Sequence, residues 1–375
     1  MNEDRATRYH RLKRQASILS LVWGVVLLAG LLAGGLSVGL RNIAFAVAGR
    51  VLPRMWAPAL AVPIYVVLLI FINELASLPL GFYSGFVLER RYGLSTERVG
   101  AWALDQIKSL ALSLLLAWGA VGLIYGLIRL SPERWWLAAG AIFALLIVVL
   151  AQLAPVLLLP LFYSVKPLDR DGLRTRLLAL ADLAGTRVLG AYEWGLAEKT
   201  KKANAALTGI GGTRRSLVSD TMLAEDSDEE IEVVLAHELA HHVHGDIWKG
   251  IALQSGLMLA GFYLAARMLA GLAGRFALDG PDDIAGLPLL VLSAGAVSLV
   301  TVPLAHAWSR ANERSADRFA LRLTSNPAAF ISAMKRLGAQ NLAEEHPSIM
   351  VQWLFYSHPP LRERIAAAQA FGKHR

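Results

Sequence analysis

The sequence contains no cysteine and few charged residues, and both shortages narrow what the chain can be. Without cysteine, disulfide bonds and thiolate zinc sites are excluded, so any metal must be bound by histidine and carboxylate. Charged residues make up 18% of the 375 residues and hydrophobic residues 55%, which is too apolar for an ordinary soluble protein. The composition therefore predicts a membrane protein.

Long apolar runs account for this composition. Runs of about 20 residues span a bilayer, and six runs are predicted as membrane helices: Ala16–Leu40, Pro58–Tyr83, Leu110–Ile128, Trp135–Phe162, Gly250–Leu272 and Ile284–Ala307. The first run is long, follows a basic N-terminus and lacks a small-residue cleavage site. We therefore expect it to be a membrane anchor rather than a signal peptide.

Basic residues gather immediately before the first run: Arg5, Arg8, Arg11, Lys13 and Arg14. Because positive residues are retained on the cytoplasmic side of a membrane, this end of the chain is expected in the cytoplasm. The net charge of +8 then reflects attraction to anionic lipid, and the lipid bilayer is an expected partner. No stripe of basic and aromatic residues suits the recognition of bases, so no nucleic-acid partner is expected.

One long polar segment, residues 164–249, interrupts the apolar runs. Within it, Leu168–Leu183 has the periodicity of a helix. Three short apolar stretches with turn or charge signals between them predict a small β-sheet: Arg187–Trp194, Ala203–Ile210 and Ser216–Asp220. The predicted fold class is mainly α, a polytopic membrane protein of about six transmembrane helices with a cytoplasmic α+β domain that carries the sheet.

The motif with the clearest chemistry is His237-Glu238-Leu239-Ala240-His241, which reads H-E-x-x-H. On a helix the two histidines lie at i and i+4 on one face, where their imidazoles can share a zinc ion. Glu238 can then reach a water molecule on the same metal and act as a general base. Ser227 and Glu230 predict a capping box at the start of this helix. A buried histidine pair without metal is the alternative.

A catalytic zinc needs a third protein ligand besides the histidine pair. His244 lies on the same helical face as the pair but about one turn further along, and three ligands along one straight helix would not surround the ion. His242 points away from that face. The sixth run exits into a segment whose helical continuation brings Glu313 to the side of His237. Asp317, one turn later, is placed to hold a zinc-bound histidine in the right tautomer. The alternative for these two acids is an ordinary helix surface.

Taken together, these residues resemble the zinc-dependent CAAX prenyl protease family (type I) and, more distantly, the HtpX-type membrane proteases. The resemblance covers most of the chain and rests on an ordered set of motifs: Phe86–Leu94, Pro160-Leu161-Phe162, Asn204–Gly209, His237–His241, Glu313-x-x-x-Asp317 and Ser357–Arg364. Such an ordered set is far more specific than the pentapeptide alone.

The resemblance implies a complete zinc site. Three side chains would bind one zinc ion per chain: His237, His241 and Glu313. Glu238 would be the catalytic base, and Asp317 would support a ligand from behind. The chain would then be a zinc metalloendopeptidase, a hydrolase of peptide bonds.

The resemblance also implies residues that contact the substrate. Asn204 and Ala205 would lie on the edge strand that pairs with the substrate backbone. His358 and Arg364 would help to stabilise the oxyanion of the tetrahedral intermediate. Taken alone, His358 would be a turn-capping residue before two prolines, and Arg364 would be a surface helix residue.

We expect four consecutive regions along the chain. Residues 1–163 would form a four-span membrane region, and residues 164–249 a cytoplasmic zincin-like catalytic segment with the sheet and the H-E-x-x-H helix. Residues 250–308 would form a two-span helical hairpin. Residues 309–375 would be a C-terminal catalytic segment with the third zinc ligand and the His-Pro-Pro motif.

The predicted function is that of an integral-membrane zinc protease which cleaves peptide or protein substrates, lipidated ones included, as in CAAX processing. The absence of an evident organelle signal favours a bacterial plasma membrane. One alternative is an HtpX-like quality-control protease of damaged membrane proteins. Another is a non-catalytic scaffold with a structural metal, although an intact Glu238 argues against it. A transporter, suggested by Glu74 within the second run, is disfavoured by the large polar segment and the lack of an evident internal repeat.

Overall fold

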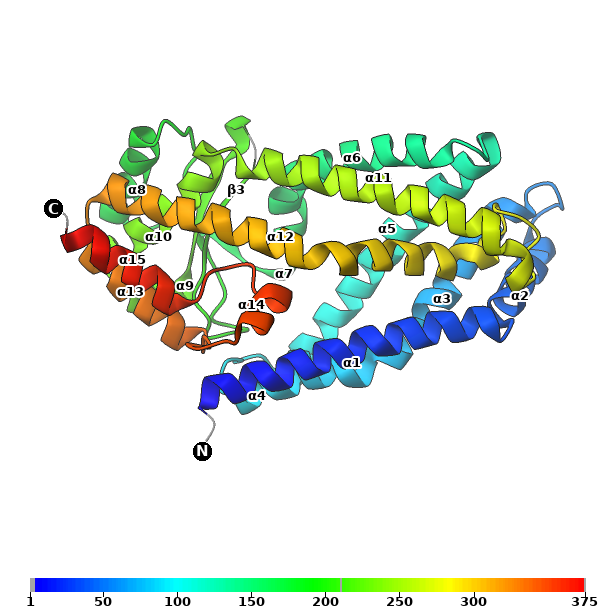
Figure 1. The fold of residues 1–375 in the computed structure, drawn as a ribbon, viewed down its shortest axis with the longest axis horizontal. Helices are drawn as coiled ribbons and strands as arrows, with labels where there is room; N and C mark the ends of the chain where they lie inside the picture. The colour runs from blue at the N-terminus through cyan, green and yellow to red at the C-terminus, as the bar shows by residue number, and fades with distance from the viewer. Residues whose placement is uncertain (1–3, 210, 374–375) are drawn as a thin grey trace.

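The computed structural model describes residues 4–209 and 211–373, and most of these residues are helical (Figure 1). The helices of the membrane part are α1 (Arg5–Ala33), α2 (Leu36–Val51), α3 (Ala57–Phe82), α4 (Leu88–Arg91), α5 (Val99–Leu130), α6 (Trp135–Leu153), α7 (Leu159–Phe162), α11 (Asp246–Leu272) and α12 (Leu287–Thr324). Short π-helical or 3₁₀ turns adjoin them: η1 (Tyr83–Val87), η2 (Ala154–Leu158), η4 (Ala273–Phe276) and η5 (Ile284–Gly286).

Among the described residues, five helices are long and apolar enough to cross a membrane: Arg5–Ala33, Ala57–Arg91, Val99–Leu130, Asp246–Phe276 and Ile284–Thr324. They correspond to five of the six predicted runs. The remaining run, Trp135–Phe162, contains a shorter apolar helix, Trp135–Ala151, and η2 interrupts its path. The mainly α, polytopic fold class is confirmed, with five long spans in place of about six.

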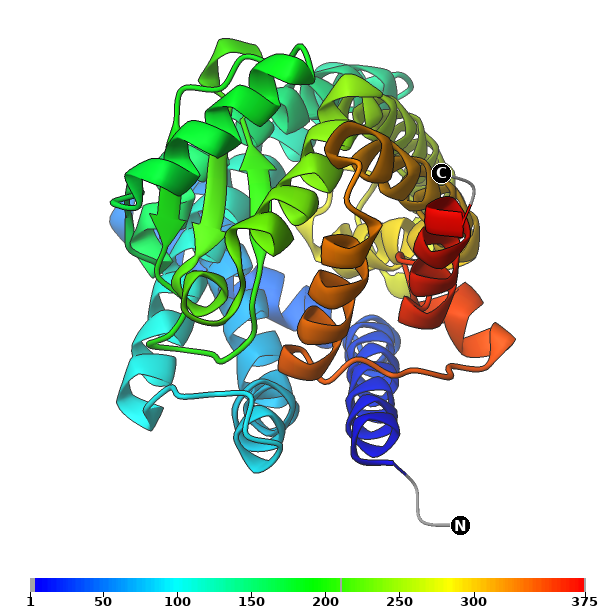
Figure 2. The same ribbon diagram turned by 90° about the vertical axis from the view of Figure 1, so that its left-hand side faces the viewer.

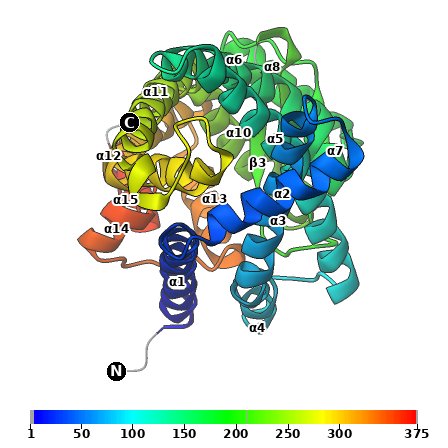
Figure 3. The same cartoon turned by 90° about the vertical axis from the view of Figure 1, so that its right-hand side faces the viewer.

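The first predicted span, Ala16–Leu40, is wrong in its extent, because it is divided between α1 and α2. Gly35 adopts a left-handed conformation, with φ of 67°, at the junction. Glycine takes this conformation without a clash from Cβ, so the helix can end within the apolar run. Figure 3 shows α2 lying across this end of the bundle, in front of α3 and α5.

The last two spans, α11 and α12, form an antiparallel pair, and α12 extends beyond α11 toward the left-hand end of the molecule (Figure 1). α12 has 38 residues, a length of about 57 Å at 1.5 Å per residue. This is nearly twice the thickness of the hydrocarbon core of a bilayer, about 30 Å. Its C-terminal part therefore continues beyond the apolar run and packs against α10 (Asp228–Val243).

A four-stranded sheet lies at the end of the molecule that is on the left of Figure 1 and nearest the viewer in Figure 2. The strand order is β1-β2-β4-β3, and only β2 and β4 run parallel. The strands are β1 (Val165–Pro167), β2 (Ala191–Trp194), β3 (Ala205–Thr208) and β4 (Arg215–Ser219). Three of them match the predicted apolar stretches, whereas β1 is too short to show a pattern. Ile210, which ends one predicted stretch, lies outside the described residues.

The remaining helices cover the sheet and the end of α12: α8 (Asp171–Leu183), α9 (Asp220–Glu225), α10, α13 (Pro327–Gln340), α14 (Ile349–Phe355) and α15 (Leu361–Lys373), with a 3₁₀ turn η3 (Gly211–Thr213). Their common core contains fully buried residues from α8, β4, α10 and α13: Leu177, Val218, Leu235 and Phe330. This core holds α10 in contact with both the edge strand β3 and α12.

Candidate metal centre

The start of α10 is set by the predicted capping box. The backbone N–H of Glu230 donates to Oγ of Ser227 at 3.3 Å, and the backbone N–H of Ser227 donates to Oε2 of Glu230 at 2.7 Å. The apolar face of the helix is buried through Ile231, Leu235 and Leu239. Packing of this face against the core turns the histidines of α10 toward α12.

The side chains of His237 and His241 meet the carboxylate of Glu313 from α12. Nε2 of His237 lies 3.1 Å from Oε2 of Glu313, and Nε2 of His241 lies 3.3 Å from Oε1. The three ligand atoms lie within 4.8 Å of one another. The structure thus brings together the three residues that were predicted as metal ligands.

This donor set fits a tetrahedral metal ion. Bonds of about 2.0–2.1 Å at the tetrahedral angle place neighbouring ligand atoms roughly 3.3–3.4 Å apart, close to the separations seen here. Oε2 of Glu313 is buried and makes no hydrogen bond with the described residues, although Nε2 of His237 is 3.1 Å away. A lone pair that faces a carboxylate oxygen is unfavourable unless a cation lies between them.

Asp317 supports His237 from the side opposite the metal position. Its Oδ1 lies 2.9 Å from Nδ1 of His237, so Nδ1–H can donate and the lone pair of Nε2 remains for a metal. Arg364 donates to both oxygens of Asp317, at 2.6 and 2.9 Å. In this geometry the Arg364 guanidinium contacts Asp317 and lies 3.3 Å from Nδ1 of His237, behind the ligand.

His241 has a matching support that the sequence reasoning missed. Oδ2 of Asp246, the first residue of α11, lies 3.0 Å from Nδ1 of His241. Gly245 has φ of 67° and turns the chain sharply between α10 and α11, which brings Asp246 back toward the metal helix. The sequence does contain a sign of this contact: Gly245 is suited to a helix C-terminus, and the acid Asp246 follows it at the start of the next helix.

The electrostatics of the centre favour positive charge. Burial lowers the pKa of His237, but its contacts with the carboxylates of Asp317 and Glu313 outweigh burial and raise the pKa to about 9. The pKa of His241 is also raised, because contact with Glu313 opposes the effect of burial. Burial raises the pKa of Glu238, and the two histidines offset this only in part. A carboxyl group of raised pKa is suited to accept and return a proton.

His358 lies at the open side of the centre. Its Nε2 is 3.4 Å from Oε1 of Glu313, and its side chain is 61% exposed. The chain before it is held by Arg310, a buried residue of α12 that donates to the carbonyl oxygens of Gln352 at 2.9 Å and Tyr356 at 2.6 Å. Arg310 was not singled out from the sequence, because its partners become neighbours only in the fold.

Ala205 is the first residue of the edge strand β3, and Asn204 immediately precedes it. The N–H of Ser219 donates to the carbonyl oxygen of Asn204 at 2.9 Å, so the backbone of Asn204 is paired with the neighbouring strand. Hydrogen bonding alternates along an antiparallel strand, and the backbone of Ala205 therefore faces away from the sheet. An extended peptide could pair with it there.

His242 links the edge strand to the metal helix. Nε of Arg214 donates to Nδ1 of His242 at 3.1 Å, so Nε2 carries the proton and donates to the carbonyl oxygen of Leu207 at 3.0 Å. As expected, His242 points away from the metal position. Its contact with Leu207 instead fixes β3 beside His241.

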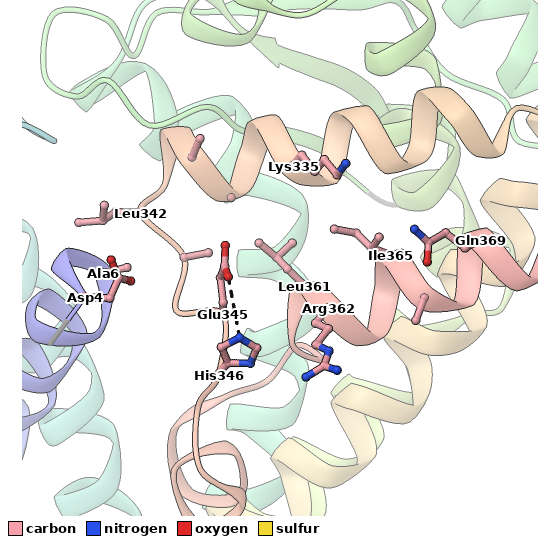
Figure 4. A pocket seen from close by; sticks show the side chains of 14 residues that line it. Asp4, Ala6, Lys335, Leu342, Glu345, His346, Leu361, Arg362, Ile365 and Gln369 are labelled. Atoms are coloured by element: carbon pink, nitrogen blue, oxygen red, sulfur yellow. Dashed lines mark ion pairs between the residues drawn. The ribbon is translucent and has the colours of Figure 1, made fainter. Parts of the chain in front are cut away.

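A cavity of about 780 Å³ lies apart from this centre, between α13, α15 and the start of α1 (Figure 4). Its lining mixes both signs of charge, with Lys335 and Arg362 alongside Asp4 and Glu345. Neither the metal-ligand residues nor Glu238 line it. The cavity is therefore separate from the predicted reaction site.

Comparison with known families gives the same assignment as the geometry. Residues 167–371 match the model of peptidase family M48. Residues 2–164 match a second model, described as the CAAX prenyl protease N-terminal region with five membrane helices. The chain belongs to peptidase family M48. This M48 peptidase is an integral, multi-pass membrane metalloendopeptidase that uses a metal and acts on peptide or protein substrates.

Relatives of this M48 peptidase occur in bacteria and plants. An uncharacterized metalloprotease of Bacillus subtilis (strain 168), YhfN, is 33% identical over 81% of this chain and 72% of its own length. The CAAX prenyl protease 1 homolog of Oryza sativa subsp. japonica is 28% identical over 79% of this chain and 70% of its own length. The sequence resemblance to the CAAX prenyl protease family is confirmed.

A solved structure shows the same fold. The crystal structure of S. mikatae Ste24p superposes with a TM-score of 0.85, covering 97% of this chain and 88% of that protein, at 23% identity. Five long spans, a small mixed sheet and a histidine-glutamate centre are therefore arranged in this M48 peptidase on an Ste24-like fold.

Proposed function

We propose that this protein is a zinc endopeptidase with one zinc ion per chain, bound by His237, His241 and Glu313. The observation that carries the proposal is the convergence of both Nε2 atoms on one carboxylate, at 3.1 and 3.3 Å. Histidine and carboxylate in this number are the donor set of a catalytic zinc with an open position. In this proposal residues 164–249 and 309–375 together form the catalytic part, and residues 1–163 and 250–308 form the membrane regions.

Zinc at this position would lower the pKa of a bound water towards about 7 and polarise the scissile carbonyl. Glu238 takes a proton from the attacking water as the new C–O bond forms. It returns the proton to the nitrogen of the leaving amine when the C–N bond breaks. Asp317 and Asp246 hold the two imidazoles in the tautomer that directs Nε2 toward the metal.

The substrate is proposed to lie extended along β3. The outward backbone of Ala205, next to Asn204, would pair with it as an added strand. His358, exposed and close to Glu313, would donate to the oxyanion. Arg364 is also proposed to help to stabilise the oxyanion. It donates to both oxygens of Asp317, so in this proposal it supplies positive charge and holds Asp317 in position against His237.

The centre is proposed to face the cytoplasm from a bacterial plasma membrane. Arg14, in the basic N-terminal cluster, donates to Oε2 of Glu344 at 2.5 Å, which supports placing that cluster on the side of the metal centre. The positive-inside rule then assigns this side to the cytoplasm.

The substrates are proposed to be membrane-bound or lipidated peptides and proteins, by analogy with relatives named CAAX prenyl protease 1. The test is zinc content together with the cleavage of a prenylated and an unprenylated peptide of the same sequence. Stoichiometric zinc and a preference for the prenylated peptide are expected. Equal cleavage of unmodified, unfolded proteins would favour quality control instead, and cleavage without metal would overturn the zinc mechanism.

A further inference from the structure

The short helix α14 exposes large apolar side chains, although it lies outside the five long spans. Ile349, Met350 and Trp353 are 77%, 73% and 52% exposed, and no residue of this helix is buried. Large apolar side chains exposed next to one another in this way mark an interaction site. The partner has to be identified from the position of the helix in the molecule.

Two arginines locate α14 relative to the membrane. Arg310, just past Ala307 at the end of an apolar run, donates to the carbonyl oxygen of Tyr356, the residue that follows α14. Arg14, just before the apolar run that begins at Ala16, lies 3.5 Å from the hydroxyl of the same tyrosine. Both spans therefore leave their apolar region at the level of the C-terminal end of α14.

The helix also lies at the outer edge of the bundle. Figures 2 and 3 look along the length of the molecule from opposite ends, and both show α14 on the periphery, beside α15. Figure 1 shows it between α12 and α1. Its exposed side chains are thus at the rim of the molecule where two spans enter the bilayer.

We propose that α14 is an interfacial helix that docks into the surface layer of the bilayer, with Ile349, Met350 and Trp353 among the lipids. The apolar surface of the neighbouring spans is covered by lipid, and α14 continues that surface at its margin. Tryptophan is enriched in this layer because its ring is apolar while its N–H reaches water. A helix that exposes apolar side chains at the membrane margin can lie in the plane of the interface, with those side chains among the lipids.

Docking of α14 in the bilayer surface would affect the position of His358 at the metal centre. Only Tyr356 and Ser357 separate α14 from His358, whose Nε2 lies 3.4 Å from Glu313. A helix held in the bilayer surface would keep this segment in place over the centre. This consequence rests on the proposed function, whereas the docking itself rests on the position and exposure of α14.

The absence of cysteine allows a direct measurement of depth. Met350→Cys and Leu183→Cys each accept one fluorescent label on the full-length protein. The two sites are matched, because Met350 is 73% and Leu183 75% exposed, but Leu183 ends α8 beside the sheet. Each labelled protein is placed in nanodiscs of phosphatidylcholine and phosphatidylglycerol, without metal, and quenched either by nitroxide lipids or by aqueous iodide.

We expect the label at 350 to be quenched by nitroxide lipid at least about threefold more than the label at 183, and to be protected from iodide. Equal quenching at the two positions would overturn the proposal. A second variant tests which side chains hold the helix. With the label at Trp353→Cys, adding Ile349→Ser and Met350→Ser should lower lipid quenching about twofold or more, and unchanged quenching would contradict docking through these residues. Neither measurement depends on peptidase activity, so failure of the proposed function would be seen separately.

Discussion

Oδ2 of Asp246 lies 3.0 Å from Nδ1 of His241. Asp317 stands in the same relation to His237, at 2.9 Å. Each histidine of the centre is therefore backed by its own carboxylate, and the two carboxylates come from the two helices that continue into the membrane. A carboxylate in this place fixes the tautomer and raises the basicity of the ligand nitrogen. The membrane hairpin α11–α12 thus supplies the proposed third ligand and the two acids behind the histidines.

Replacing Asp246 should weaken metal binding without abolishing it. We expect Asp246→Ala to lower zinc affinity about 10–100-fold, because His241 loses the acceptor that orients its ring. Competition with a fluorescent chelator measures the change. Lys249→Ala is the matched control, since Lys249 contacts the other oxygen of Asp246 and is exposed. Equal affinities for the two variants would show that Asp246 does not support the ligand.

The proposed base can be separated from the metal ligands. Glu238→Gln should retain stoichiometric zinc, because Glu238 is not among the three converging ligand residues. Peptidase activity should fall about 10²–10⁴-fold, because the amide cannot accept the proton of water. Metal analysis and peptide cleavage on one preparation give both values. Full turnover in this variant would exclude Glu238 as the base.

The third ligand is tested by removing its carboxylate. Glu313→Ala should lose zinc, because two histidines alone leave the ion short of a protein ligand. Glu363→Ala is a suitable control, because Glu363 pairs with Arg314 at the exposed side of the same helix. Stoichiometric zinc in Glu313→Ala would point to another ligand such as His244. In the structure, however, the His244 ring packs edge-on against Phe319, with 5.5 Å between ring centroids.

Local patterns predicted much of this molecule because their physical causes are local. The capping box of Ser227 and Glu230 depends on residues three apart, and the H-E-x-x-H spacing depends on one helical turn. The continuation of α12 beyond Ala307 is also a local property, and it predicted that Glu313 lies on the same side of the membrane as His237.

The parts that sequence reasoning missed depend on contacts between distant segments. The break at Gly35 lies within an unbroken apolar run, so hydropathy alone could not show it. Arg310 finds its carbonyl partners only when α14 packs on α12, and Asp246 reaches His241 only because Gly245 reverses the chain. Arg364 contacts both oxygens of Asp317 only because α15 packs on α12, and its role at the oxyanion stays a prediction.

A buried acid near the metal helix should make stability depend on pH. Burial, and then the charge of Glu230, raise the pKa of Asp226 from its ordinary 3.8 to about 6, although Gln340 and Arg336 partly oppose this. The folded protein therefore holds this proton more tightly than the unfolded chain. Ionisation of Asp226 in the folded protein therefore lowers the free energy of unfolding. This cost is absent below about pH 4, grows as the pH rises towards 6, and is constant at higher pH.

Asp226→Asn should remove that cost. Oδ1 of Asp226 and Oε1 of Gln340 both lack hydrogen-bond partners among the described residues, and the new amide can donate to Gln340. A pKa difference of about 2 corresponds to a gain of up to about 3 kcal/mol at pH 8. Thermal unfolding of the metal-free protein in detergent should show a higher midpoint for the variant at pH 8 and little difference at pH 4. A gain of equal size at both pH values would mean that the added hydrogen bond, and not the relief of charge, stabilises the variant.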